Sequence, residues 1–554
     1  MKHRIRRSCL VAGFLIPIAL GSQSSVAQYI ANFQTNVISA VTSNWSGTYY
    51  VGNTNFADSL IVLGGGILSD NSAYLGYGVG SSNNTVLVTD PGSVWSNGWD
   101  GLTVGYYGPG NSVVVSNGGQ VISGEVYLGC DGNSSSNNSI VVTGCGSILT
   151  SDPSFVFAGC IAPGNRIVVS DGGQFAVPYG FSYIGYYQDL GWSSNNSVLV
   201  TGPGSRWAGE TRLTVGGQNN DLVVSNGAWM TTDSGTIGDI DVTMTVAGTG
   251  SVWSNSGDIL IGRAWGSNTC LMVKDGGEVM NSDTIVGWGG PYAGGPTFCN
   301  DNSVLVTGTG SVWSSTGTLT IGFGDNGVGN SLIISNGGVV IDDSSTIGFC
   351  AGCSDNYALV TGVGSVWSNL SSLVIDMYAE ASSVVVSGGT LFATNVVIGA
   401  VSPPCNNMLR LDSGEVSIRN AAGNAALEIR YGELILNGGV LQADTLVITN
   451  PCASLIHTGG TMIVGSVILD PNTFRIVSVT PTGNDVLVTW RMGPGATNTL
   501  QATAGDGSGG YGTNGFTDIF VVTNNTTVGT VTNYLDIGAA TNMPTRYYRA
   551  RLVP

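Results

Sequence analysis

The feature that most constrains this chain is a ten-residue block that recurs along most of its length. In its fullest form the block reads Val-Leu-Val-Thr-Gly-x-Gly-Ser-Val-Trp, and its copies are spaced roughly 50 residues apart. A second block, Asn-Ser-Val-Val-Val-Ser-Asn-Gly-Gly-x-Val, lies between successive copies of the first. The first block occupies Val86–Trp95, Ile140–Leu149, Val198–Trp207, Met244–Trp253, Val304–Trp313 and Ala358–Trp367, and the second begins at Asn111, Asn165, Asn220, Asn268 and Asn330.

The two blocks align as variants of one unit of roughly 27 residues. Each unit contains three short runs rich in Val, Ile, Leu and Thr, bounded by Gly, Asn and Ser, which is typical of strands and turns. One such unit cannot bury its own apolar face, but stacked units bury a continuous core and pair their backbones about 4.8 Å apart. The repeat therefore predicts an all-β fold, a right-handed parallel β-helix (β-solenoid).

Composition supports this fold over its alternatives. Only 9% of the residues are charged while 42% are hydrophobic, so the chain lacks the charges that solvate amphipathic helices. Disorder is excluded for the body because disordered chains are poor in the β-branched and aromatic residues that are abundant here.

The repeats also divide the chain. They predict roughly 16 coils and a rod about 75 to 80 Å long, within a β-helical domain at 28–470 whose last coils lose the Trp block. Beyond this point, longer alternating strands such as Val486–Trp490 and Tyr547–Leu552 predict a β-sandwich-like C-terminal domain at 471–554.

The first 27 residues are typical of a signal peptide. A basic start, Met1–Arg7, is followed by an apolar run at Cys9–Gly21 and by Ser25-Val26-Ala27. We expect cleavage after Ala27 and a secreted protein. The apolar run is too short to cross a membrane, and no later run reaches the roughly 20 residues needed, so no transmembrane segment is expected.

The pair of blocks, as it stands in variants within 302–341, resembles the autotransporter and PEP-CTERM-associated repeat of large bacterial secreted proteins. The resemblance covers about Ser81 to Ser387. It implies a passenger-type β-helix at the bacterial cell surface or outside the cell, and it brings no catalytic residues with it.

Charge and histidine content narrow the functions. The net charge is −18, with 17 basic and 35 acidic residues, and nucleic acid is therefore not expected as a partner. Of the two His, His3 lies in the leader and His457 in a repeat turn. Ser-His-Asp, Cys-His and multi-histidine zinc sites are thus disfavoured, and we expect no catalysis.

The alternative is a carbohydrate-binding or carbohydrate-active β-helix, because pectin lyases and polygalacturonases share this architecture. Inverting glycoside hydrolysis needs two carboxylates a few ångströms apart. Asp342 and Asp343 are the only adjacent aspartate pair, but no Gly-His-Gly or Arg-Ile-Lys element accompanies them. This pair is a weak candidate, and a solvated corner is the favoured explanation.

Tryptophan supplies the candidate binding row. The residue before each Trp is apolar in nearly every unit, as in Val94 and Val312, and we assign it to the core. Side chains alternate along a strand, so the next residue is then expected to point outward. This reasoning predicts an exposed row for stacking sugars or another protomer, with a structural cover as the other reading, although Arg206 in an inward position argues against this phase. The row is Trp95, Trp207, Trp253, Trp313 and Trp367.

Asparagine and cysteine positions predict structural roles. Asparagines at the start of each coil, namely Asn84, Asn111, Asn138, Asn196, Asn268, Asn302 and Asn330, are expected to stack as a ladder. Cys130 and Cys160 hold matching positions and are expected to form a disulfide, since the compartment is oxidising. Cys350 and Cys353 indicate a local disulfide or free thiols rather than a zinc site.

No cofactor is expected. The segment Gly324-Asp-Asn-Gly327 suits Ca²⁺ through its oxygens, but the calcium-binding nonapeptide is absent. The sequence therefore favours a structural or adhesive surface or matrix protein, with glycans, other surface molecules or further copies of itself as partners.

Overall fold

The computed structural model describes residues 29–553 with short gaps, so the predicted signal peptide, 1–27, lies outside the described residues. Every named element is a β-strand. Within this described part, no helix is long and apolar enough to cross a membrane. The gaps are 131–133, 153–154, 160–161, 188–190, 264–265, 290–298, 325–326, 380, 402–404, 449, 451, 470–474, 493–496, 506–509, 513–514, 525–529 and 542–544.

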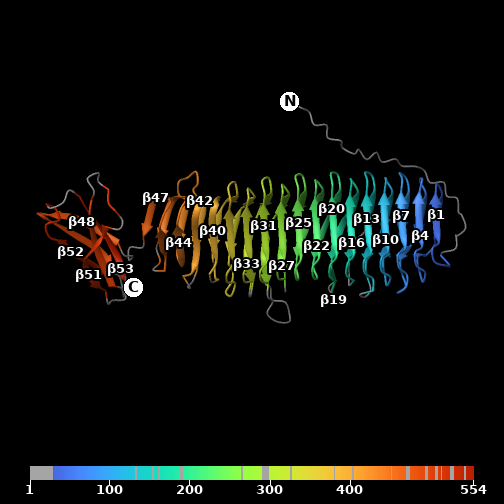
Figure 1. Cartoon of the computed structure of the whole chain (residues 1–554), viewed down its shortest axis with the longest axis horizontal. Helices are drawn as coiled ribbons and strands as arrows, with labels where there is room; N and C mark the ends of the chain where they lie inside the picture. The colour runs from blue at the N-terminus through green and yellow to red at the C-terminus, as the bar shows by residue number, and fades with distance from the viewer. Residues whose placement is uncertain are drawn as a thin grey trace, which may run out of the picture.

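A single 45-stranded sheet winds into a rod, with a smaller β-body beyond its C-terminal end (Figure 1). Its strands form three ladders in which each strand pairs in parallel with the equivalent strand of the coils before and after it. At three strands per coil this gives about 15 turns, and slightly more because six long strands round a corner and serve two ladders. The expected parallel β-helix is confirmed, with close to the expected number of coils.

The first ladder faces the viewer in Figure 1. It comprises β1 (Thr35–Ser39), β4 (Ser59–Leu63), β7 (Thr85–Thr89), β10 (Ser112–Ser116), β13 (Ser139–Thr143), β16 (Arg166–Ser170), β20 (Ser197–Thr201), β22 (Asp221–Ser225), β25 (Thr243–Ala247), β28 (Cys270–Lys274), β31 (Ser303–Thr307), β34 (Ser331–Ser335), β37 (Tyr357–Thr361), β40 (Ser383–Ala393), β42 (Asn407–Ile418), β44 (Gly432–Leu436) and β46 (Ser454–His457).

The second ladder carries the Trp block. It comprises β2 (Thr42–Asn44), β5 (Ile67–Asp70), β8 (Val94–Asn97), β11 (Gln120–Ser123), β14 (Ile148–Ser151), β17 (Gln174–Ile184), β21 (Arg206–Val215), β23 (Trp229–Thr232), β26 (Val252–Asn255), β29 (Glu278–Asn281), β32 (Val312–Ser315), β35 (Val339–Asp342), β38 (Val366–Asn369), parts of β40 and β42, β45 (Val440–Ile448) and β47 (Thr461–Leu469).

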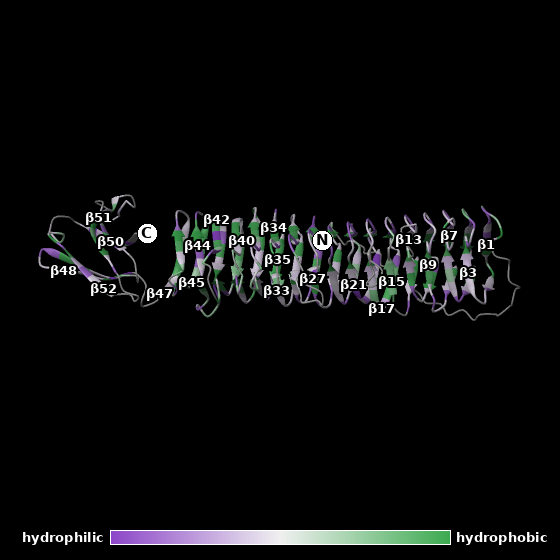
Figure 2. Cartoon of the chain, turned by 90° about the horizontal axis from the view of Figure 1, so that it is seen from below, coloured by the Kyte–Doolittle hydropathy of each residue, from purple (hydrophilic) through white to green (hydrophobic). Residues whose placement is uncertain are grey.

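The third ladder faces the viewer in Figure 2. It comprises β3 (Thr48–Val51), β6 (Ser72–Leu75), β9 (Leu102–Val104), β12 (Val126–Leu128), β15 (Phe155–Ala158), parts of β17 and β21, β24 (Ser234–Ile237), β27 (Ile259–Arg263), β30 (Thr284–Gly289), β33 (Thr318–Gly324), β36 (Ser344–Ile347), β39 (Ser372–Ile375), β41 (Asn395–Ile398), β43 (Ala426–Ile429), and parts of β45 and β47. A small hairpin of β18 (Tyr186–Tyr187) and β19 (Gly191–Trp192) branches from the rod.

One continuous apolar core runs through the rod, from Ile38 to Leu446. Along each strand, buried residues alternate with partly exposed ones, as in Ser112–Ser116, where Val113 and Val115 face inward. This alternation follows from the pleat of a strand, whose successive side chains point to opposite faces. Stacking in parallel register then places like residues above one another, so Val113 lies between Val86 and Ile140.

The C-terminal region consists of two three-stranded antiparallel sheets. The first contains β48 (Arg475–Thr482), β49 (Asp485–Met492) and β52 (Thr530–Asp536), and the second β50 (Thr497–Ala504), β51 (Thr517–Thr523) and β53 (Arg546–Val553). They share one apolar cluster around Val488, Trp490 and Leu500, the arrangement of a small β-sandwich. The predicted boundary between the two domains, at 470/471, falls in the segment 470–474, which the structure does not describe, and it stays a prediction.

Candidate functional site

The predicted row of outward tryptophans is wrong, because these side chains lie inside the rod. Each of them is at most 1% exposed, and they are among the largest fully buried side chains of the chain: Trp95, Trp207, Trp253, Trp313 and Trp367. The residues before them, such as Val94 and Arg206, are the ones that point outward. A row buried in this way offers no surface for stacking sugars.

The error arose from the alignment of the two blocks. In the structure Trp95 pairs with Val121, whereas Val94 pairs with Gln120. The first strands of the two coils are also in register, with Thr89 paired to Ser116. The corner between Thr89 and Val94 is therefore one residue longer than the Asn-Gly-Gly corner between Ser116 and Gln120. This extra residue shifts the phase of the second strand by one and reverses every side chain. The inward position therefore alternates between Trp and smaller residues, a pattern that fills a core.

The buried indoles are held by hydrogen bonds to polar side chains of the preceding coil. The Nε1–H of Trp95 donates to Asp70 at 2.7 Å, and that of Trp313 donates to Asn281 at 2.8 Å. Trp253 and Trp367 donate in the same way to Thr232 and Asp342. Trp207 differs, since its ring stacks on Phe175 at a centroid distance of 4.5 Å. Four of these five indoles thus pack in the core with an internal partner for the N–H, whereas the buried Nε1–H of Trp207 has no hydrogen-bond partner among the described residues.

The aspartate pair does not form a catalytic site. Asp342 points into the core and is fully buried, whereas Asp343 is exposed on the outside of the corner. Burial raises the pKa of Asp342 to about 6, while hydrogen bonds from Trp367, Ser345 and Asn369 oppose the rise. β35 ends at Asp342, whose carboxylate lies inside the rod while that of Asp343 lies outside it, so the two carboxylates do not face one substrate.

The asparagine ladder is confirmed as a structural element. The Asn111 side-chain oxygen accepts hydrogen bonds from the backbone N–H and the side-chain amide of Asn84, at 3.0 and 2.8 Å, and Asn111 repeats both contacts toward Asn138. The ladder continues to Asn220, and a second segment runs from Asn302 to Asn356. It therefore supplies buried acceptors for backbone N–H groups at the start of each coil.

One expected member of the ladder is displaced. Asn268 lies one residue early, with φ of 55°, and the ladder position belongs to Thr269, which donates its backbone N–H to Asn302. Glycines at the ends of third-ladder strands make room for this row. A Cβ on Gly105, for example, would overlap the amide of Asn138.

Two disulfides join pairs of described residues. Cys350 and Cys353 are bonded, with Cα atoms 5.4 Å apart, so the local disulfide is the form found. A second bond joins Cys405 to Cys452, with Cα atoms 5.7 Å apart, and the sequence did not predict it. The predicted Cys130–Cys160 bond is wrong, because Cys130 is not disulfide-bonded, whereas Cys145 is.

The described residues contain no group of three or more His, Cys, Asp or Glu side chains that could hold a metal ion. The central residues of the calcium candidate Gly324–Gly327 lie outside the description, so that candidate is untested. His457 is exposed, and its ring contacts the carbonyl of Gly460.

The outer face of the third ladder carries an aromatic cluster near the N-terminal end of the rod. Tyr50 stacks on Tyr74 with ring centroids 5.7 Å apart, and Tyr77 packs edge-to-face against both of them. Tyr77 also stacks on Tyr106 at 5.3 Å, and Tyr106 contacts Tyr107. These rings come from three successive coils and form one continuous aromatic surface.

A hollow of about 440 Å³ lies on this surface. We call it the aromatic groove. Its residues combine aromatic rings, hydroxyls and carboxylates, and none is basic: Thr48, Tyr50, Ser72, Tyr74, Tyr77, Trp99, Asp100 and Glu125. Trp99 is 81% exposed, which is unusual for an indole in a folded protein. Burial raises the pKa of the Tyr74 hydroxyl.

The aromatic surface continues beyond the groove. Tyr127 stacks on Phe157, and Phe157 on Tyr183, each at 5.1 Å, while Arg212 lies over the ring of Phe181. Acidic side chains border it: Glu125 accepts a hydrogen bond from the Tyr127 hydroxyl at 2.5 Å. Aromatic faces beside carboxylates provide both stacking and hydrogen-bond acceptors.

A second hollow of about 340 Å³ lies further along the same face. Its rings, Phe323 and Phe349, stack at 5.0 Å. Its carboxylates serve the backbone: Asp283 accepts from the backbone N–H and hydroxyl of Thr318, at 2.6 and 3.0 Å, and Asp258 accepts from the N–H of Asp283 at 3.4 Å. Its acidic groups are therefore already engaged within the protein.

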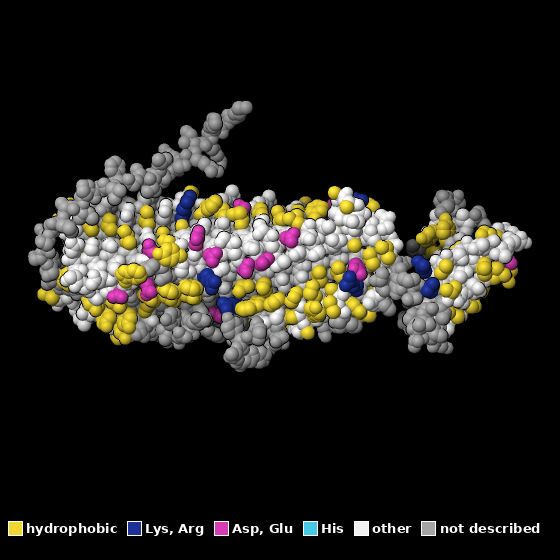
Figure 3. All heavy atoms as spheres, turned by 180° about the vertical axis from the view of Figure 1, so that it is seen from behind, with side chains coloured by type: hydrophobic (Ala, Val, Ile, Leu, Met, Phe, Trp, Pro, Cys, Tyr) yellow, Lys and Arg dark blue, Asp and Glu magenta, His cyan; other side chains and the backbone are white. Residues whose placement is uncertain are grey.

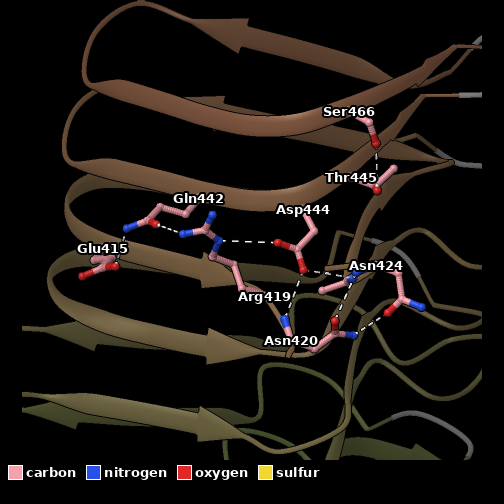
Figure 4. A network of polar contacts seen from close by, with 9 residues as sticks. Glu415, Arg419, Asn420, Asn424, Gln442, Asp444, Thr445 and Ser466 are labelled. Carbon is pink, nitrogen blue, oxygen red and sulfur yellow. Dashed lines mark hydrogen bonds and ion pairs between the residues drawn. The ribbon is translucent and has the colours of Figure 1, made fainter. Parts of the chain in front are cut away.

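A polar network covers the last coils (Figure 4). Arg419 reaches Asp444 at 3.5 Å and donates to Gln442 at 2.7 Å, and Gln442 donates to Glu415 at 3.0 Å. Asp444 also accepts the backbone N–H of Asn420 at 3.1 Å, which together with Arg419 holds the pKa of its carboxyl below the usual range. These groups bind one another, and the network has the character of a structural brace.

Comparison with known proteins adds little to this geometry. No family model matches the chain, and no curated protein matches it. Among solved structures, the chain is similar to a TibA fragment described as hyper-glycosylated in a TibC-catalysed reaction. The identity is 14%, the match covers 79% of this chain and 98% of that one, and the TM-score is 0.23. At this score the likeness carries no argument, and the resemblance to the autotransporter and PEP-CTERM-associated repeat stays a prediction.

The sequence reasoning missed the residues of the aromatic groove. They come from four coils and belong to no block, but one signal was present. Tyr50, Tyr74 and Tyr127 occupy one outward position of the third strand, which aligned repeats would have shown as an aromatic column.

Proposed function

We propose that the chain is a rigid rod that acts outside the bacterial cell by adhesion, as a surface or matrix protein, and that it performs no catalysis. The observation that carries this proposal is the aromatic groove, whose exposed Trp99 and tyrosines are suited to binding rather than to core packing. A stable rod that carries such a face is well suited to holding a partner at a distance from the cell.

The chemistry of the outer faces supports binding over turnover. The groove offers Asp100 and Glu125 but no lysine, arginine or histidine among its residues. Charged side chains are sparse over the face seen in Figure 3, where hydrophobic side chains form interrupted rows along the rod. A carbohydrate-active β-helix is expected instead to gather basic and acidic groups in one cleft.

Two features support a location outside the cell. Residues 1–27 have the three parts of a signal peptide, and Cys350–Cys353 and Cys405–Cys452 are disulfides, which persist in oxidising compartments.

The test is a glycan array run in parallel with a polysaccharide degradation assay on the chain lacking residues 1–27. We expect binding to a subset of glycans and no new reducing ends or unsaturated products. Release of either product would contradict the proposal, and so would a chain that binds no glycan and no extracellular matrix component.

Self-association is a second candidate, favoured by a separate feature. The central outward residue of the first ladder is apolar in a long series of coils, interrupted only by Thr245 before Arg410 ends it: Ile61, Leu87, Val114, Val141, Val168, Leu199, Val223, Met272, Leu305, Ile333, Leu359 and Val385. An apolar row of this length suits lateral packing of two rods.

Light scattering tests this self-association. It should show a dimer that dissociates in the variant Leu199→Lys but persists in Ile122→Lys, a change on another outer face. A chain that is monomeric at all concentrations would exclude self-association through this row.

A further inference from the structure

The aromatic groove contains an exposed indole, Trp99, on a turn whose backbone is hydrogen-bonded to the rod. Trp99 lies in a turn from Gly98 to Gly101 that is closed by a hydrogen bond from the Gly101 N–H to the Gly98 carbonyl at 3.1 Å. The same carbonyl accepts the N–H of Gly124 in the next coil at 3.2 Å. Gly101 has φ of 72°, and a Cβ there would overlap the backbone of Glu125. The backbone of the turn is thus fixed against the rod, and the indole extends from it into solvent.

The groove runs along the rod axis. Tyr50 lies on β3, Tyr74 on β6, Trp99 in the turn before β9, and Glu125 directly before β12. These are four successive coils, so the groove extends over about 14 Å at one strand spacing per coil. The distance from one coil to the next, about 4.8 Å, is close to the length of one pyranose residue in an extended glycan chain.

The polar groups of the groove indicate which class of sugar it would bind. Asp100 and the second carboxylate oxygen of Glu125, whose first oxygen accepts from Tyr127, are acceptors for the hydroxyl groups of a sugar. Thr48 and Ser72, whose hydroxyls lie 2.9 Å apart, line the other end. No basic residue lines the groove, so a uronic acid would face carboxylates without a counter-charge. A neutral glycan avoids this repulsion and places its C–H faces on the rings.

We propose that the aromatic groove binds a neutral, extended polysaccharide parallel to the rod axis, with about one sugar residue per coil, and that Trp99 is its main stacking platform. The inference rests on the proposed function, since it names the ligand class of an adhesive rod.

The experiment measures calorimetric binding of cello-oligosaccharides, from the disaccharide to the hexasaccharide, to the chain lacking residues 1–27. Affinity should rise with length up to about the tetrasaccharide and then level off, because the groove covers four coils. Trp99→Ala should weaken binding roughly tenfold or more, as the loss of a central aromatic anchor does. Trp229→Ala is the matched control, since this indole is also exposed, at 44%, but lies on β23 of the second ladder.

The same series with oligogalacturonides tests the charge argument. These anionic chains should bind at least tenfold more weakly than neutral chains of equal length, and Asp100→Asn with Glu125→Gln should narrow that difference. Equal affinity of wild type and Trp99→Ala for the neutral chains would overturn the site while leaving the adhesive proposal intact. Tighter binding of the oligogalacturonides would overturn the neutral assignment. Absence of binding to either series would overturn the glycan assignment, whereas the adhesive proposal falls only if the chain also binds no extracellular matrix component.

Discussion

The Trp-bearing coils and the last coils of the rod have the same backbone geometry but are held together differently. Between β4 and β39, buried polar side chains form directional contacts, namely the asparagine ladder and the indole hydrogen bonds. From β42 to β47, aliphatic residues such as Val416 and Leu441 take the interior positions. Ion pairs and the Cys405–Cys452 disulfide brace these coils. A β-solenoid therefore needs a filled interior and satisfied backbone groups, and more than one set of side chains provides them.

The largest expected effect is in the Trp coils. Trp313→Ala should lower the free energy of unfolding by about 3–5 kcal/mol, because it leaves a large cavity and removes the donor to Asn281. Urea unfolding measures this loss, with Trp99→Ala as the control, since an exposed indole should cost no more than about 0.5 kcal/mol. Equal losses for both variants would refute the buried assignment.

The next effect belongs to the last coils. Replacing Cys405 and Cys452 together by serine should cost about 2–4 kcal/mol, since the bond closes a loop across 47 residues of sequence. Hydrogen exchange should quicken in β42–β47 and stay unchanged in the Trp coils. The same change at Cys350 and Cys353, which are three residues apart, should cost less; the reverse order would contradict this account of the brace.

The asparagine ladder should respond with an intermediate loss. Asn111→Ala removes the acceptor for the buried backbone N–H of Asn84, and an unsatisfied buried donor costs about 1–3 kcal/mol. Asn437→Ala is the control from the last coils, because Asn437 is exposed, and its side-chain contacts, to Asp412 and to the Thr458 hydroxyl, are made at the surface. If the two variants unfold at the same urea concentration, the ladder has no special role.

A pH dependence follows from Asp70, the buried acceptor of Trp95. Burial raises its pKa from 3.8 to about 8, so between pH of about 4 and about 8 the folded state holds a proton that the unfolded chain has lost. The free energy of unfolding should therefore fall as pH rises through this window. Asp70→Asn places an amide beside Trp95, as Asn281 lies beside Trp313, and should make the slope shallower; the part that remains comes from other buried carboxyls such as Asp342, whose pKa is also raised. The variant should gain at least about 1.4 kcal/mol at pH 9, the equivalent of one pKa unit. Urea titrations at both ends of the window measure the slope, and an unchanged slope would contradict the assignment.

The smallest effect is expected for the ion pairs of the last coils. Arg419 is half exposed, with 51% of its side chain accessible, and Arg419→Gln should cost less than about 1 kcal/mol. This cost should shrink further at high salt, whereas the loss in Trp313→Ala should not. A salt-independent loss above 2 kcal/mol would mean that the network of Figure 4 is a core element.

The sequence predicted the architecture because a repeat shows directly what must stack. The alternation in Ser112–Ser116 and the asparagines at each coil start were sufficient for the first ladder. The second ladder was predicted out of phase, because the corner after Thr89 is one residue longer than the corner after Ser116 and no local pattern fixes that register.

The disulfide Cys405–Cys452 and the aromatic groove could not be predicted in the same way, because their residues occupy different positions in different repeats. Cys405 and Cys452 lie where the repeats have lost their blocks, so nothing in the sequence aligned them. The aromatic groove combines a strand residue such as Tyr74 with a turn residue such as Trp99, and their proximity depends on the stacking of coils.

The central claim is that the tryptophans inside the rod build it and that the one in the aromatic groove binds its ligand. The most direct test compares Trp313→Ala and Trp99→Ala in two measurements, thermal unfolding and binding to a neutral oligosaccharide. Contacts in a solenoid are local to neighbouring coils, so Trp313→Ala should lower the melting temperature and keep wild-type binding, whereas Trp99→Ala should keep the melting temperature and lose binding. The opposite pattern, or loss of both properties in both variants, would contradict the account.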